Sequence, residues 1–228
     1  MTESINRNDL KASEHQRLVF LKKHLQAVQA KIEMLNGKQY SFDEESERLY
    51  DAVAPVYDNS FFRETISQLE ELIPGKGNLS ERLNSYRNNF IIPRENQESV
   101  YIEPIPECRL RTSNFIQLPQ NEKFDIDFVS GKSWGAYNWY KGNYYSLIQI
   151  NTDLPVQIYR AIYGGSHEGY PGHHVFNALR ENYLVKKKGW IEHTIYPLFS
   201  PQSLIAEGTA VFGSELVMPF QQRLTFER

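Results

Sequence analysis

The sequence His-Glu-Gly-Tyr-Pro-Gly-His-His at residues 167–174, called the octet below, places three imidazoles and one carboxylate within eight positions. Four of the six histidines of the chain fall between residues 167 and 193, so histidine is concentrated here. A His-Glu pair followed closely by another His is typical of zinc hydrolases, in which one element supplies two metal ligands and a general base. The octet therefore indicates both a metal site and the helix that carries it.

The spacing of the octet departs from the common HExxH pattern. In HExxH the two histidines are four positions apart and share one face of a helix. Here His173 follows His167 by six positions, which on a straight helix rotates one side chain about 120° from the other and separates them by about 9 Å. Pro171 removes a helical N–H, and Gly172 permits unusual dihedral angles. We expect a distortion at these two residues that returns His173 to the side of His167.

Two alternatives to this interpretation stay open. The Pro-Gly pair is also a turn signal, so a histidine-rich surface loop is the structural alternative. Within the metal interpretation, His174 is the alternative to His173 as the second ligand.

A second segment, residues 203–217, predicts a buried helix. Pro201 precedes it, and Ser203 is the candidate N-cap. Glu207 and Glu215 lie within its apolar run, and buried carboxylates are rare unless they are paired or bind a metal. Glu207 is therefore the candidate third ligand, with an exposed acid near the helix start as the alternative.

Taken together, HEGYPGHH and the later AEGTAVFGSE at 206–215 resemble the DUF885 family, a bacterial family of unknown function marked by HExxPGH and a downstream EGxA helix. The likeness covers about the last hundred residues, and a threonine stands where EGxA usually has an aromatic residue. Because that family is similar to zincin-like metallopeptidases, the resemblance implies a zinc-dependent hydrolase that cleaves peptides. It implies one zinc ion on His167, His173 and Glu207, with Glu168 as general base.

The chemistry expected of such a site follows from its charges. Zinc held by two imidazoles and one carboxylate lowers the pKa of its bound water toward about 7. Glu168 takes the proton of that water and passes it to the leaving amine. Glu215 and His174 are candidates for orienting a ligand histidine through a hydrogen bond. Tyr163, Tyr170 and Arg160 are candidate substrate contacts, although none is assigned as a substrate-binding residue, and the substrate is expected to be a peptide or a small molecule.

Two other classes of function stay open at this stage. One is a helical binding module that keeps the scaffold without catalysis. The other is a metal-dependent hydrolase that acts on a non-peptide bond.

Composition excludes several classes of protein. The chain has 228 residues, of which 40% are hydrophobic and 23% charged, as in an ordinary globular protein. A net charge of −3 argues against a nucleic-acid partner. No apolar run reaches about 18 residues, and the polar N-terminus lacks the apolar core of a signal peptide, so we expect neither a membrane span nor a leader. The single Cys108 excludes an internal disulfide, and we expect a cytoplasmic protein.

Periodicity along the rest of the chain predicts a mainly α (α+β) fold. Residues 1–100 form a helical N-terminal region, with helices expected over His15–Leu35, after a capping box of Ser41 and Glu44, from Asn59 or Ser60 to Ile73, and from Ser80 to before Pro93.

Residues 101–228 are expected to form a zincin-like core with a small sheet and an active-site helix. Residues 93–121 carry four prolines and are predicted to be a linker or an extended segment. Strands are expected over 124–128 and 143–151, and a helix over Leu154–Tyr163. Members of the similar family continue well beyond the EGxA helix, so we expect this core to be incomplete at its C-terminus.

Overall fold

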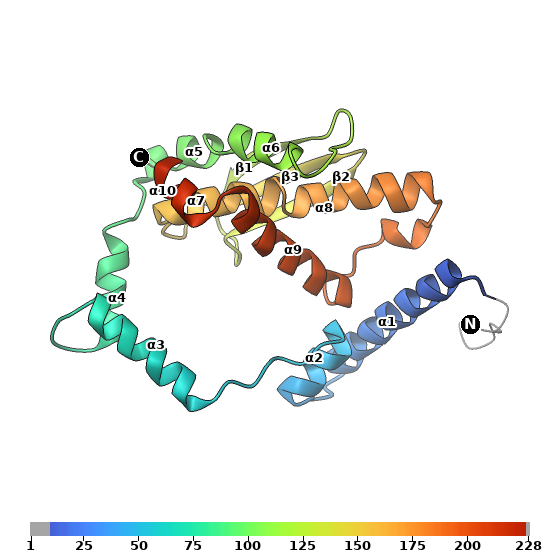
Figure 1. The fold of residues 1–228 in the computed structure, drawn as a ribbon. Coiled ribbons are helices and arrows are strands. Elements are labelled where there is room, and N and C mark those ends of the chain that lie inside the picture. Colours follow the sequence, from blue (N-terminus) through green and yellow to red (C-terminus); the bar gives the residue numbers. More distant parts are fainter. Residues whose placement is uncertain (1–9, 227–228) are drawn as a thin grey trace. The chain divides into compact units, whose positions relative to one another are not determined.

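The structure, a computed structural model, describes residues 10–226 (Figure 1). They form two compact units. The first consists of the described residues up to Pro55 together with Tyr183–Gly208, and the second of Val56–Asn182 together with the described residues from Thr209 onward. The division expected at residue 100 falls inside a helix of the second unit. Most of the polar stretch in which no leader is expected lies outside the described residues.

The first unit is built around a pair of helices, α1 (Ala12–Leu35) and α2 (Phe42–Tyr50). The capping box predicted for α2 is confirmed, because the Ser41 hydroxyl accepts the Glu44 N–H and the Glu44 carboxylate accepts the Ser41 N–H. The 3₁₀ turn η5 (Ile191–Thr194) is held to α1 by an ion pair between Arg17 and Glu192, with Nε and Oε1 2.5 Å apart.

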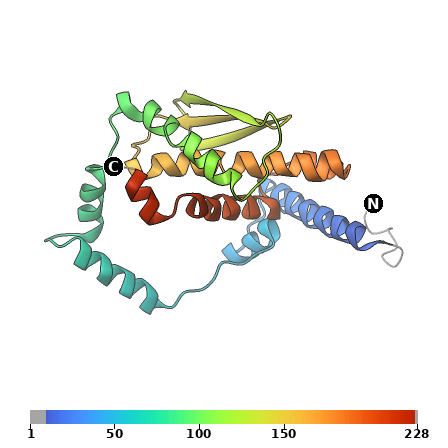
Figure 2. The same cartoon turned by 45° about the horizontal axis from the view of Figure 1, so that its top comes forward.

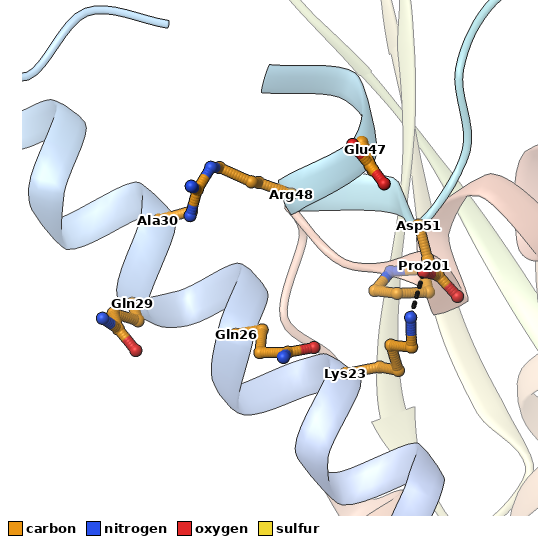
Figure 3. A pocket seen from close by; sticks show the side chains of 8 residues that line it. All are labelled: Lys23, Gln26, Gln29, Ala30, Glu47, Arg48, Asp51 and Pro201. Atoms are coloured by element: carbon orange, nitrogen blue, oxygen red, sulfur yellow. Dashed lines mark hydrogen bonds and ion pairs between the residues drawn. The ribbon is translucent and has the colours of Figure 1, made fainter. Parts of the chain in front are cut away.

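A polar hollow of about 400 Å³ lies between α1 and α2 (Figure 3). Lys23 of α1 pairs there with Asp51, the residue that ends α2. Ala30 on the wall of the hollow is buried, and the remaining side chains around it are exposed or partly exposed and mostly polar.

The second unit is mainly helical with one small sheet, which confirms the predicted fold class. Its helices and strands are α3 (Asn59–Leu72), α4 (Leu79–Asn88), α5 (Arg94–Ile102), α6 (Ile105–Ser113), β1 (Lys123–Val129), β2 (Ala136–Gly142), β3 (Tyr145–Asn151), α7 (Ile158–Gly164), the π-helical η3 (Gly165–Gly169), α8 (His173–Arg180) and α10 (Phe220–Phe226). The π-helical η4 (Glu181–Lys187) and helix α9 (Pro201–Val217) each cross the boundary between the units. None of the helices in residues 10–226 combines the length and apolar character needed to span a membrane.

The prediction of a linker over 93–121 is wrong, because α5 and α6 occupy most of it. Pro93 and Pro104 are the N-caps of these helices, and Pro106 lies in the first turn of α6. The missing N–H of proline costs nothing at a helix start, where the first N–H groups have no intrahelical partner. The prolines therefore begin helices here instead of preventing them.

The N-caps of α3 and α4 also differ from the prediction. Asp58 caps α3 and Asn78 caps α4, each accepting the N–H of a serine two residues later. Each N-cap therefore lies one or two residues before the predicted one.

The sheet has the strand order β1-β3-β2, with β1 parallel and β2 antiparallel to β3. Strand β2 was not among the strands predicted from the sequence. The hairpin turn consists of Asn143 and Tyr144, both with positive φ (53° and 60°), so β3 begins two residues later than expected. Helix α7 likewise begins at Ile158 and not at Leu154.

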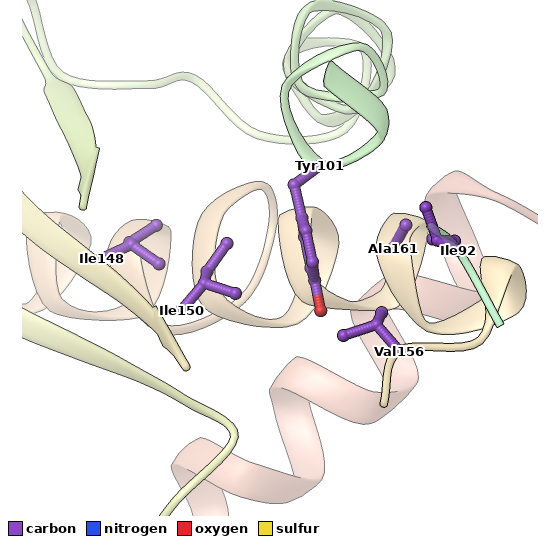
Figure 4. Close-up of a cluster of buried hydrophobic side chains, with 6 residues drawn as sticks. All are labelled: Ile92, Tyr101, Ile148, Ile150, Val156 and Ala161. Atoms are coloured by element: carbon purple, nitrogen blue, oxygen red, sulfur yellow. The ribbon is translucent and has the colours of Figure 1, made fainter. Parts of the chain in front are cut away.

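The core of the second unit lies between the sheet and the helices on one of its faces (Figures 2 and 4). Ile148 and Ile150 of β3 point from the sheet into this core, where they meet Tyr101 of α5 and Ala161 of α7. Burial raises the pKa of Tyr101 to about 12. The segment α7–η3–α8, which contains the octet, packs across the same face of the sheet.

This arrangement predicts a large stability cost at β3. Ile148→Ala should lower the free energy of unfolding by about 2–5 kcal/mol, because Ile148 is 1% exposed and its removal leaves a cavity. Val56→Ala is the control, since Val56 is 94% exposed and should change stability by less than about 0.5 kcal/mol. Urea denaturation measures both, and equal midpoints would contradict the assigned core.

Candidate metal centre

The helix that carries the octet changes its winding at the octet itself. Helix α7 passes into the π-helical turn η3, which contains His167 and Glu168, and regular helix resumes with α8 at His173. Between them Tyr170 is extended, and the Tyr170–Pro171 peptide bond is cis. The predicted distortion of the helix at Pro171-Gly172 is therefore present.

Gly172 folds this short connection back against the preceding turn. Its N–H donates to the carbonyl of Ser166 at 2.9 Å, and the Tyr170 N–H donates to the carbonyl of Gly165 at 3.2 Å. A Cβ atom on Gly172 would lie 1.7 Å from the carbonyl oxygen of His167. Only glycine permits this approach, which places His173 next to the turn that holds His167.

The two imidazoles consequently lie side by side. The ring centroids of His167 and His173 are 4.8 Å apart, with the ring planes nearly perpendicular at 89°. The ring of Tyr163 of α7 also stacks on the imidazole of His167, with centroids 4.9 Å apart and an angle of 29° between the ring planes. His167 is buried and His173 is half-buried.

A carboxylate completes this group. One potential ligand atom each from His167, His173 and Glu207 lies within 4.8 Å of the other two. Glu207 is exposed and belongs to α9, a continuous helix in which the boundary between the units falls after Gly208. The structure therefore brings together the three residues predicted to be ligands.

Within the second unit, α9 is fixed directly to the octet segment. The Ser166 hydroxyl donates to the Ser214 hydroxyl at 2.9 Å. A Cβ atom on Gly213 would lie 2.6 Å from Cγ of Pro171, so the glycine allows the helix to approach the proline closely.

Two predictions about α9 are corrected. Ser203 is not the N-cap, because the helix already begins at Pro201 and the Ser203 hydroxyl donates to the carbonyl of Leu198 at 2.5 Å. The helix is also not buried as a whole: its buried positions follow a stripe, and Glu207 and Glu215 both lie on the exposed side. The sequence analysis assumed that these two carboxylates are buried and therefore need a partner or a metal. Because both are exposed, that argument does not hold.

Glu215 is the other candidate on α9. It is exposed and lies eight positions after Glu207 on the same helix, which corresponds to about 12 Å along the axis. Its role in orienting a ligand histidine stays a prediction.

Glu168, the predicted general base, lies within the π-helical turn directly after His167. The residue is 7% exposed. Its main-chain carbonyl accepts a hydrogen bond at 2.8 Å from the side-chain amide of Asn138 on β2. This bond ties the turn to the neighbouring strand of the sheet.

His174 occupies the interior instead of the metal site. It is fully buried, with Nδ1 2.9 Å from the Ser146 hydroxyl and Nε2 2.9 Å from Oε2 of Glu122. Both ring nitrogens are engaged, which favours His173 over His174 as the second ligand. The order Ser146–His174–Glu122 has the connectivity of a nucleophile, base and acid, but Ser146 is 0% exposed and a substrate would not reach it.

Glu122 is a buried carboxylate that sequence analysis did not single out. It accepts hydrogen bonds from His174, from the Tyr170 hydroxyl at 2.5 Å and from the Arg109 guanidinium. Burial acts to raise its pKa, and the bonds from His174, Tyr170 and Arg109 act to lower it; together they hold the pKa below the ordinary value of 4.5. Glu122 is therefore an ionised acceptor at neutral pH.

The donor set fits a zinc ion. Zinc in hydrolases is commonly bound by two imidazoles and one carboxylate at about 2.0–2.1 Å, with a fourth position open. Donor atoms around such a tetrahedral ion are about 3.3 Å apart. The potential donor atoms of His167, His173 and Glu207 lie within 4.8 Å of one another, somewhat wider than this spacing.

Comparisons of the chain with protein-family models, with curated proteins and with solved structures found no match. The resemblance of the octet and the EGTA segment to the DUF885 family stays a prediction.

The fold-back predicts that Gly172 tolerates no side chain. Gly172→Ala should lower the free energy of unfolding by at least about 2 kcal/mol, because the new Cβ meets backbone that must move. Gly135→Ala is the matched control, since its Cβ would make only an ordinary contact of 3.9 Å with Leu154. Thermal denaturation compares the two, and equal effects would contradict the close approach at residue 172.

The lowered pKa of Glu122 predicts a component of stability that is lost in acid. This component is fully present above pH 4.5 and falls as the pH drops through the lower pKa of the folded protein. The stability advantage of the wild type over Glu122→Gln should therefore shrink below pH 4.5. Urea denaturation at a series of pH values measures it, and parallel profiles for the two proteins would refute the assignment.

Proposed function

We propose that this chain is a zinc-dependent hydrolase that cleaves peptide bonds. His167, His173 and Glu207 hold the metal, and Glu168 is the general base. The observation that carries the proposal is the meeting of these two imidazoles and the carboxylate, although the histidines have a spacing that a regular helix would separate.

The position of Glu168 supports its role. It is the residue directly after His167, on the same π-helical turn, which would keep it in the neighbourhood of an ion bound by that histidine. When bound, zinc lowers the pKa of a coordinated water toward about 7 and polarises a substrate carbonyl. Glu168 accepts the proton of the attacking water and delivers it to the leaving amine. The bond from Asn138 holds the backbone of Glu168 in place during both transfers.

A peptide substrate is supported by the sheet. Strand β2 is an edge strand that pairs with β3 on one side, and through Asn138 it lies next to Glu168. An extended peptide can add to such an edge as a further strand, and the main-chain hydrogen bonds would then fix the positions of its carbonyl groups beside β2. A non-peptide ester or amide remains the second candidate substrate, since the same donor set hydrolyses both.

Metal content tests the proposal first. The purified protein loaded with zinc and dialysed should retain about one zinc per chain, and His167→Ala or His173→Ala should lose most of it, because each removes one of three ligands. His15→Ala is the control, since His15 is exposed on α1. Elemental analysis reads the result, and a wild type without zinc would favour an inert binding module.

Glu168→Gln tests the catalytic role. It should keep the zinc and lower kcat by about 10²–10⁴-fold, because the amide no longer accepts the proton. Glu98→Gln, exposed on α5, should be fully active. A peptide library and a panel of esters are digested in parallel. Full activity of Glu168→Gln would rule out the mechanism, and turnover of esters alone would exclude the peptidase assignment.

A further inference from the structure

Glu122 joins the two sides of the interrupted helix. Its Oε2 receives both the Tyr170 hydroxyl at 2.5 Å and Nε2 of His174 at 2.9 Å. Tyr170 lies just before the Pro171-Gly172 connection and His174 lies two residues after it. One carboxylate oxygen therefore spans the connection that separates His167 from His173.

The other carboxylate oxygen of Glu122 forms an ion pair with a partly exposed arginine. Its Oε1 accepts Nε of Arg109 at 2.9 Å and Nη2 at 2.6 Å. The Glu122 side chain is 1% exposed, whereas that of Arg109 is 52% exposed. A buried carboxylate is costly without compensation, and this guanidinium supplies a charge that balances it.

The hydrogen-bond roles in this group are fixed by chemistry. Because an ionised carboxylate only accepts, Nε2 of His174 carries the proton that points at Glu122. The second ring nitrogen, Nδ1, lies 2.9 Å from the Ser146 hydroxyl of β3, which can act as donor or acceptor toward it. Phe124 of β1 packs on the rings of both Tyr170 and His174, with centroids 5.0 and 5.3 Å apart. The carboxylate thus has one arrangement of partners and little freedom to change it.

We propose that Glu122 is the positioning residue of the metal centre: by holding Tyr170 and His174 on one oxygen, it sets the separation of the His167 and His173 imidazoles. The inference rests on the proposed zinc site and adds a residue that touches neither metal nor substrate. Loosening Glu122 lets the chain on either side of Gly172 move apart, and the ligands next to it move as well.

The test measures metal binding apart from activity. Glu122→Gln keeps the size of the side chain and replaces one acceptor by an amide. Its affinity for Zn²⁺, measured by competition with a chromogenic chelator, should fall by about 10–100-fold, as for other residues that support metal ligands indirectly. With Co²⁺ as a spectroscopic probe at saturation, its visible absorption bands should differ from those of the wild type, because the ligand geometry has changed.

Two further variants separate positioning from general stability. Tyr170→Phe removes one of the two bonds to Oε2 and keeps the ring in the core, so its zinc affinity should also fall, but less. Glu192→Gln breaks a second carboxylate–arginine pair, that of Glu192 with Arg17 of α1, in which the carboxylate side chain is 7% exposed. It should lower the melting temperature without changing zinc affinity more than about twofold.

The outcomes distinguish this inference from the proposed function. A wild type that binds no zinc would overturn the metal site itself and the role of Glu122 with it. A wild type that binds zinc, together with unchanged affinity and cobalt spectra in both Glu122→Gln and Tyr170→Phe, would overturn the positioning role alone. Equal loss of affinity in Glu192→Gln would also overturn it, because general destabilisation would then explain the effect.

Discussion

The hydrogen bond from the Gly172 N–H to the Ser166 carbonyl is the contact on which the candidate centre depends. It closes a loop of seven residues, from Ser166 to Gly172, and it forms because Gly172 has no Cβ that would clash with the His167 carbonyl. A regular helix would turn His173 about 120° away from His167. The π-helical turn and the backward fold of the chain at Gly172 compensate for this rotation. The imidazoles of His167 and His173, which a regular helix would separate, therefore lie next to each other. Insertions of this kind in helices are frequent at functional sites.

Local signals in the sequence were enough to predict several parts of the fold. Ser41 and Glu44 are three positions apart and form the capping box that begins α2, because both bonds are made within one turn. The alternation around Ile126 predicted β1 in the same way. The wrong predictions concern residues that occur in more than one kind of local structure. Pro104 was interpreted as part of a linker but caps a helix. Strand β2 was not predicted, because its pairing with β3 is a tertiary contact that the sequence alone does not give.

The grouping of His167, His173 and Glu207 was predictable from the sequence, whereas the residues that support it were not. Histidines six apart with Pro-Gly between them indicate a metal-binding octet, and the structure brings His167, His173 and Glu207 together. Glu122 gave no such signal: it lies between Asn121 and Lys123, in a polar turn before β1, where a glutamate is normally exposed. It is buried because Tyr170 and His174 fold over it, and this depends on the tertiary structure alone. His174 was noticed for its chemistry, but its buried position assigns it to this network.

Zinc K-edge X-ray absorption on the metal-loaded protein tests most directly whether the fold-back brings both imidazoles to one cation. The account predicts two imidazole nitrogens and an oxygen shell at about 2.0–2.1 Å, with one imidazole lost in His173→Ala and the imidazole number unchanged in His174→Ala. A shell with a single imidazole, or one that changes in His174→Ala and not in His173→Ala, would contradict it.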